Sequence, residues 1–109
     1  MGYDNGLAER VRILLKDKPG FSQKKMFGGV GFLLRGNMAC GILNDDLIVR
    51  VGPEKYKEAL ALNHARQFDI TGRPMKGWVM VSSEGTETIQ DLSAWVGRGI
   101  AFALTLPAK

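Results

Sequence analysis

The residue types that carry out chemistry in proteins are few in this chain. His64 is its one histidine and Cys40 its one cysteine. A zinc site of the usual nitrogen and sulfur ligands therefore cannot be built within one chain. Cys40 lies in a predicted strand between Ala39 and Gly41, which favours a buried, inert thiol and a reducing compartment. We interpret His64, at the end of a predicted helix, as a surface residue near the last helical carbonyls.

Three short motifs suggest chemistry, but local structure explains each of them more simply. Asp45-Asp46 could attract a cation, yet two adjacent acids without further oxygen ligands usually shape a turn. Gly28-Gly29-Val30-Gly31 lacks the lysine and hydroxyl residue of a phosphate loop and precedes a strand instead of a helix. Ser82-Ser83-Glu84 has no histidine or lysine partner in sequence, so helix capping accounts for it. We expect no catalytic residue, no metal site and no cofactor.

The segment 73–78, Arg-Pro-Met-Lys-Gly-Trp, is the best candidate for a contact surface. It places two cations, a flexible thioether and an indole on or beside a loop stiffened by proline, a composition suited to binding a partner. The alternative is that Met75 and Trp78 are core residues that fix the loop to a sheet. In the functional interpretation five cations form one basic rim, and the interaction surface consists of Lys24, Lys25, Arg50, Arg73, Met75, Lys76 and Trp78.

The bulk composition is that of a small soluble domain. A chain of 109 residues with 45% hydrophobic residues predicts a single domain over residues 1–109. The longest uncharged stretch, 99–108, is about half of what a bilayer span requires, and no signal peptide is recognised. We therefore expect a cytoplasmic protein without membrane contact.

The net charge of +4 is concentrated near the start of the chain, where residues 1–25 hold six basic and three acidic side chains. A solvated helix face explains this excess. The alternative is weak, salt-sensitive binding of nucleic acid by the basic first helix and the loop residues of the basic rim.

Hydrophobic periodicity predicts the strands that must position these residues. Apolar residues alternate with a period of two within 26–51, which indicates an antiparallel meander of three strands. Gly36-Asn37 and Asn44-Asp45-Asp46 are suited to its two turns. Two further short strands are predicted at 67–70 and 78–81.

Helical spacing of apolar residues predicts helices over 5–16, 53–62 and from about residue 86 to 107, with Thr86 or Thr88 as the last N-cap. Gly97 and Gly99 indicate a kink in the last helix or its close packing on another backbone. This helix also has a wide apolar face, which suggests self-association through Trp95, Phe102 and Leu106. The element order predicts a two-layer α+β fold with a five-stranded antiparallel sheet covered by helices.

Three stretches go beyond generic patterning: 26–32, Met-Phe-Gly-Gly-Val-Gly-Phe; 47–53, Leu-Ile-Val-Arg-Val-Gly-Pro; and 68–78, Phe-Asp-Ile-Thr-Gly-Arg-Pro-Met-Lys-Gly-Trp. In order and spacing they closely resemble the N-terminal domain of the TfoX/Sxy family, over nearly the whole chain. The resemblance implies an α-β(3)-α-β(2)-α arrangement similar to that of type III secretion chaperones. It carries over motif residues with structural duties: Phe27, Gly28, Gly29, Gly52, Gly72, Pro74, Met75 and Trp78.

The resemblance also implies a role in natural competence, in which family members act as co-activators alongside a cyclic-AMP receptor protein rather than as enzymes. We therefore expect a non-enzymatic interaction module that modulates transcription through a protein partner, either the transcription machinery or a regulator. Two alternatives stay open, which are weak direct binding of nucleic acid and binding of a small molecule.

Overall fold

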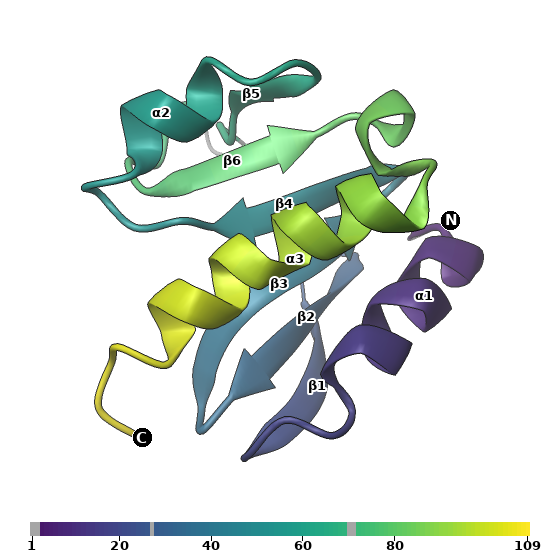
Figure 1. Ribbon diagram of the computed structural model, residues 1–109, viewed down its shortest axis with the longest axis vertical. Coiled ribbons are helices and arrows are strands. Elements are labelled where there is room, and N and C mark those ends of the chain that lie inside the picture. Colours follow the sequence, from purple (N-terminus) through teal and green to yellow (C-terminus); the bar gives the residue numbers. More distant parts are fainter. Residues whose placement is uncertain (1–2, 27, 70–71) are drawn as a thin grey trace.

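The computed structural model describes residues 3–26, 28–69 and 72–109, which form one antiparallel sheet with helices on one face. The strand order is β1-β2-β3-β4-β6-β5. In Figure 1, α1 and α3 lie across the sheet, while α2 lies beside β5 and β6. The strands are β1 (Phe21–Met26), β2 (Gly29–Leu34), β3 (Asn37–Leu43), β4 (Asp46–Arg50), β5 (Ala65–Gln67) and β6 (Trp78–Val81). The helices are α1 (Asn5–Leu15), α2 (Tyr56–Leu60), α3 (Ile89–Ala103) and the short 3-10 helix η1 (Ser83–Thr86).

The sequence predicts five strands, whereas the described residues form six. The additional strand is β1, which pairs with β2 from Phe21 opposite Leu34 to Met26 opposite Gly29. Residues 22–25 of β1 are exposed, so this edge strand lacks the apolar alternation from which a strand is predicted. Its lysines also discourage the free edge from pairing with another chain.

The turns of the meander are two residues long. Arg35 and Gly36 form the first, with φ of 55° and 83°, the conformation of a type I′ hairpin. The turn therefore lies one residue earlier than predicted, because Asn37 already belongs to β3. There the Asn37 side-chain amide donates a 2.8 Å hydrogen bond to the carbonyl of Pro107 and fixes the end of the chain. Of the predicted second turn Asn44-Asp45-Asp46, Asn44 and Asp45 form the turn, and Asp46 already belongs to β4.

Side-chain caps set the start of the two longer helices. The Asp4 carboxylate accepts a 3.1 Å hydrogen bond from the amide of Leu7 at the start of α1. The Thr88 hydroxyl accepts one of 3.1 Å from the amide of Asp91, so Thr88 rather than Thr86 caps α3. The last helix ends at Ala103 instead of continuing to 107, and the Thr105 hydroxyl donates a 2.6 Å bond to the carbonyl of Phe102 just beyond it.

The predicted bounds of the second helix, 53–62, and of the strand at 67–70 are also wrong, since α2 ends at Leu60 and β5 at Gln67. The second helix begins at Tyr56 rather than Pro53, since residues 53–55 form a turn that follows Gly52 at φ +88°. The strand predicted at 67–70 is the shorter β5, shifted to Ala65–Gln67. Of that predicted strand, Ile70 lies outside the described residues. The strand at 78–81 is confirmed.

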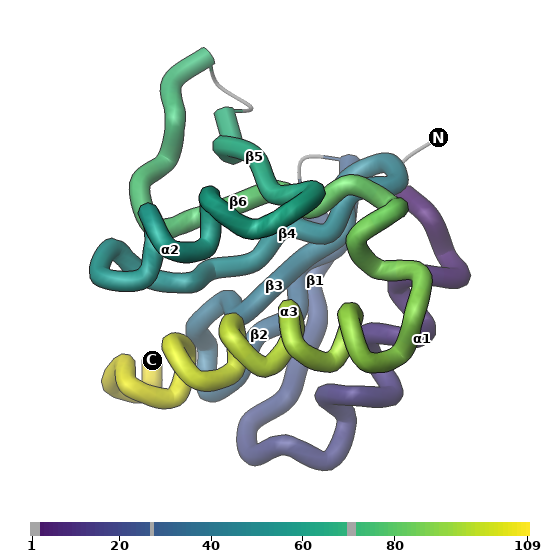
Figure 2. The backbone as a smooth tube through the Cα atoms, turned by 45° about the horizontal axis from the view of Figure 1, so that its top comes forward, coloured from purple at the N-terminus to yellow at the C-terminus, as the bar shows by residue number. Residues whose placement is uncertain are grey.

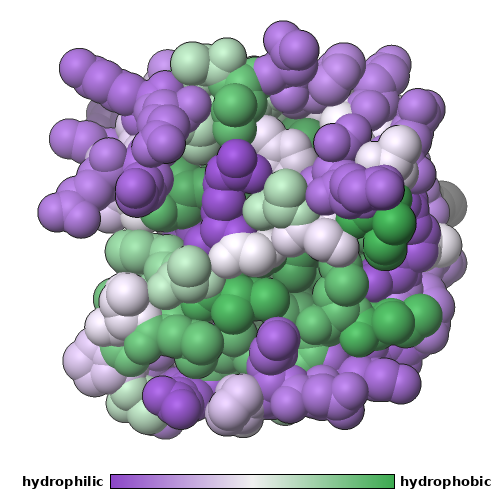
Figure 3. Space-filling view, viewed as in Figure 1, coloured by the Kyte–Doolittle hydropathy of each residue, from purple (hydrophilic) through white to green (hydrophobic). Residues whose placement is uncertain are grey.

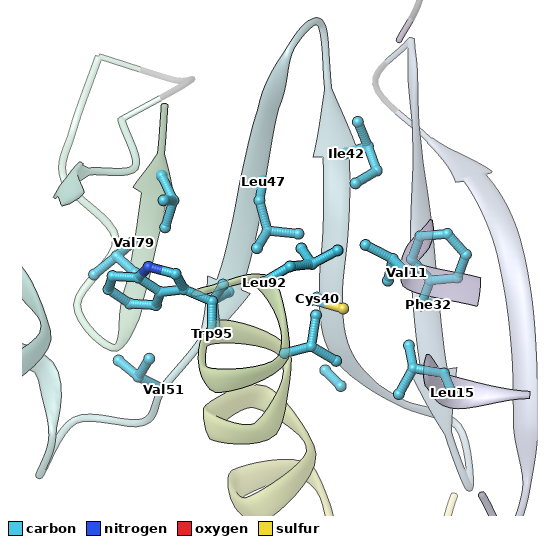
Figure 4. Close-up of a cluster of buried hydrophobic side chains, with 14 of the residues drawn as sticks. Val11, Leu15, Phe32, Cys40, Ile42, Leu47, Val51, Val79, Leu92 and Trp95 are labelled. Carbon is cyan, nitrogen blue, oxygen red and sulfur yellow. The ribbon is translucent and has the colours of Figure 1, made fainter. Parts of the chain in front are cut away.

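The core lies between the sheet and the helices (Figure 4). Phe32, Leu47 and Val79 project from the strands toward Leu15 of α1 and Leu92 of α3. A second, smaller cluster on the opposite face of the sheet contains Ile48, Phe68 and Met80. None of the helices in the described part of the chain is long and apolar enough to cross a membrane.

Close backbone approach explains one of the two glycines in α3. A Cβ atom on Gly99 would lie 2.3 Å from the carbonyl oxygen of Ala39, at a bulge in β3. A Cβ atom on Gly97 would meet no described atom within 4 Å. The close packing predicted for this helix is therefore confirmed at Gly99 and is not required at Gly97. Trp95, only 5% exposed, packs in the core, and self-association through this helix stays a prediction.

Candidate functional site

The structure does not bring the predicted basic rim together. Lys24 and Lys25 lie on the edge strand β1, whereas Arg73 and Lys76 are exposed in the segment that leads into β6. Three strands lie between β1 and β6, which places these strands on the order of 20 Å apart across the sheet. Arg50, at the end of β4, is close to the β6 side only. The five cations therefore do not form one continuous surface.

Two of the predicted residues do meet. Arg50 and Trp78 are direct partners in the β4–β6 pairing, and the Arg50 guanidinium carbon lies 5.2 Å from the centre of the Trp78 ring. On α3, the ring of Phe102 lies 5.4 Å from the same carbon. A guanidinium group stacks favourably on aromatic faces, so these contacts tie β4 and β6 to α3.

Two glycines shape the backbone beneath this aromatic group. The amides of Val51 and Gly52 both donate to the carbonyl of Gly77, over 2.8 and 3.0 Å. A Cβ atom on Gly52 would lie 2.5 Å from Cδ1 of Phe102, and the φ of Gly52 is +88°. Glycine at position 52 therefore permits both the positive φ and the seating of the Phe102 ring on the backbone.

The other motif residues have local duties. A Cβ atom on Gly29 would lie 2.1 Å from the carbonyl oxygen of Ile42, so glycine permits the close approach of the two backbones there. Gly28 and Gly72 have φ of +78° and +86°. Pro74 lies in the exposed segment before β6. Phe27 lies outside the described residues.

Met75 and Trp78 differ in their burial. The Met75 amide donates a 2.9 Å hydrogen bond to the carbonyl of Phe68, but the residue as a whole is 36% exposed. Trp78 is half-buried, and its ring centre lies 6.2 Å from that of Phe68. Trp78 therefore anchors the segment to the sheet, as the core alternative predicts, while Met75 is open to a partner.

A groove of about 560 Å³ lies beside the Phe102 ring, between residues 51–59 and the C-terminal half of α3. Figure 2 shows the two walls facing each other, and Figure 3 shows the hollow at the left edge of the molecule. The groove has an apolar lining of Val51, Gly52, Pro53, Ala59, Ala101 and Phe102, which we call the groove floor. Its polar lining residues are Glu54, Lys55, Glu58, Arg98 and Thr105.

Sequence reasoning missed this groove, although a signal for its α3 wall exists. Arg98, Ala101, Phe102 and Thr105 recur at intervals of three and four, the spacing of one helical face. The opposite wall begins at Val51, 47 residues before Arg98, and no periodicity in the sequence links the two walls. Only the sheet and its crossing helix place them together.

The chemical groups singled out from the sequence lie elsewhere. Cys40 is fully buried, and desolvation raises the pKa of its thiol from 9.0 to about 12. His64 is exposed, as predicted, and its carbonyl accepts a 3.0 Å hydrogen bond from the amide of Ser82. Within residues 3–26, 28–69 and 72–109, no group of three or more His, Cys, Asp or Glu could hold a metal ion. The groove thus offers apolar contact and fixed charges.

Comparison with known protein families settles the relationship. The family model of the TfoX N-terminal domain matches residues 14–103. The chain belongs to the TfoX N-terminal domain family. This family is associated with the regulation of competence. The matched region runs from within α1 to the last residue of α3 and therefore includes both walls of the groove up to Phe102. No curated protein matches the chain significantly.

Proposed function

We propose that this TfoX N-terminal domain protein is a non-enzymatic interaction module that modulates transcription by binding a protein partner in the groove between α2 and α3. The observation that carries the proposal is the apolar groove floor beside the contacts of Arg50 with Trp78 and Phe102. Aromatic residues and arginine are enriched at protein interfaces and dominate their binding energy.

The proposed surface extends from the groove onto the adjoining segment before β6. Gly77 joins the two through its hydrogen bonds to Val51 and Gly52. Arg73, Met75 and Lys76 are exposed on this segment and add cations and a flexible thioether. The expected likeness to type III secretion chaperones belongs to the same proposal, and superposition on a solved chaperone structure tests it.

The basic residues favour a protein partner over nucleic acid. On α1, Arg12 pairs with Glu9, and the Arg10 guanidinium donates 3.2 Å to the carbonyl of Glu87. The exposed lysines of β1 lie on the edge of the sheet away from Arg73 and Lys76. Phosphate recognition is strongest where cations gather on one face. Titration with duplex and single-stranded DNA at low salt should therefore give no saturable binding.

Site-specific photo-crosslinking in the native cell tests the proposed function. Lys55 lines the groove with a side chain that is 70% exposed, so p-benzoylphenylalanine can replace it at the rim and should crosslink to a discrete protein that mass spectrometry identifies as part of the transcription machinery or a regulator. The matched control places the same residue at Lys24, exposed on β1. A crosslink at position 24 alone, or crosslinks to no transcription protein, would contradict the proposal.

A further inference from the structure

The two walls of the groove carry opposite charges that are not paired across it. Arg98 lies on the α3 wall and Glu54 on the opposite wall, and neither forms an ion pair with any other residue that the structure describes. Lys55 and Glu58, on the same side as Glu54, lie 3.8 Å apart and partly neutralise each other. The groove is therefore polarised, with an available cation on one side and an available carboxylate on the other.

The position of Arg98 is fixed by its own helix. Its guanidinium carbon lies 4.7 Å from the centre of the Trp95 ring, and Trp95 is almost entirely buried. Stacking on a buried ring restricts the long side chain before any ligand arrives. A carboxylate that binds Arg98 therefore loses less free energy to the ordering of that side chain than one that binds a freely moving arginine.

The groove floor indicates what must accompany that carboxylate. Ala101 and Phe102 present apolar surface on α3, and Val51 and Ala59 present it on the other side. A volume of about 560 Å³ falls within the range of sites that enclose a ligand or several side chains. Burial of large apolar side chains supplies the affinity, and the two walls supply the orientation.

We infer that the groove takes an amphipathic segment of the protein partner, with large apolar side chains on the floor, a carboxylate beside Arg98 and a basic side chain beside Glu54. The inference rests on the proposed function and names the chemistry of its partner. The charges of the groove favour this occupant because Arg98 and Glu54, which form no ion pair with another described residue, then each gain an opposite charge.

Selection from a displayed library of random short peptides tests the inference. Peptides selected on the wild-type chain should combine large apolar residues with Asp or Glu, and Arg98→Glu should weaken them about tenfold in fluorescence anisotropy. Exchange of the peptide acid for lysine should restore binding to Arg98→Glu. Arg98→Met, which keeps a stem over Trp95, should lose the acidic preference while the protein stays folded.

Two further variants separate the effect of charge from that of the groove. Lys24→Glu makes the same change in net charge on β1 and should leave peptide affinity within about twofold, because screening weakens distant charges. Ala101→Trp fills the groove from an exposed position and should abolish binding of the selected peptides. Circular dichroism confirms that each variant is folded.

The outcomes distinguish this inference from the proposed function. If peptides bind and Ala101→Trp abolishes binding, but Arg98→Glu has no effect, the inference is wrong and the proposed function stands. If no peptide is selected, or Ala101→Trp changes nothing, the inference and the proposed docking surface both fail. If sedimentation shows self-association that Ala101→Trp removes, the occupant is a second copy and the inference is wrong.

Discussion

Single residues decide the shape of the groove, and Gly52 is the clearest case. Its φ of +88° and the Phe102 ring above it both exclude a side chain. The sequence identifies Gly52 as a structural motif residue. It does not reveal that the ring beside it comes from a helix 50 residues later in the chain. The positive φ of Gly52 is a local property of the chain, whereas the Phe102 ring that packs on this glycine comes from a distant segment.

We predict that Gly52→Ala lowers the free energy of unfolding by about 2 kcal/mol or more, because backbone strain and overpacking add. Gly28→Ala is the matched control, since Gly28 has a φ of +78° but no described atom within 4 Å of an added Cβ. It should cost about 1 kcal/mol from backbone strain alone. Urea unfolding measures the free energy of unfolding of both variants. Equal losses in the two variants would contradict a contribution from the contact with Phe102.

A second prediction for a single residue concerns the buried thiol of Cys40. Burial raises its pKa from 9.0 to about 12, so the folded protein holds the proton more tightly than the unfolded chain. The stabilisation is fully present below pH 9 and is lost as pH rises toward 12, at about 1.4 kcal/mol per pH unit at most. Cys40→Ala should show a shallower fall of unfolding free energy with pH. Rapid modification of the native thiol at pH 8 would contradict this burial.

Among the elements, those with a buried face were predictable and those without one were not. Leu7, Val11 and Leu15 mark α1 because one face of this helix is in the core. In the strand β1 only the end residues Phe21 and Met26 are partly buried, so the segment lacks the alternation that predicts a strand. The ends of α2 and α3 depend on turns and on contacts at the end of the chain, which periodicity does not record.

The two glycines of α3 provide a paired prediction. Gly99→Ala should lower the free energy of unfolding by about 1–3 kcal/mol, because its Cβ would meet the Ala39 carbonyl at 2.3 Å and displace the helix. Gly97→Ala should raise it by about 0.5–1 kcal/mol, because alanine favours the helix and no described atom is nearby. Thermal and urea unfolding measure the sign of the change in unfolding free energy for each variant. The same sign for both variants would contradict the packing of α3 on β3.

At the scale of the whole molecule, topology decides which charges and rings meet. The pairing of β4 with β6 brings Arg50 to Trp78, and α3 crosses the sheet so that Phe102 reaches them. The same order separates Lys24 and Lys25 from Arg73 and Lys76. Motifs in the sequence identified the family and some of these residues. The groove follows from strand order and helix crossing, which no local pattern specifies.

The most direct test of the central claim is an NMR titration of the ¹⁵N-labelled chain with the partner identified by crosslinking. If the groove is the interaction surface, the largest amide shift changes should fall within residues 51–59 and 98–105, and Ala101→Trp should remove them. Changes confined to β1, or to the exposed segment 72–76 without the groove, would contradict the claim.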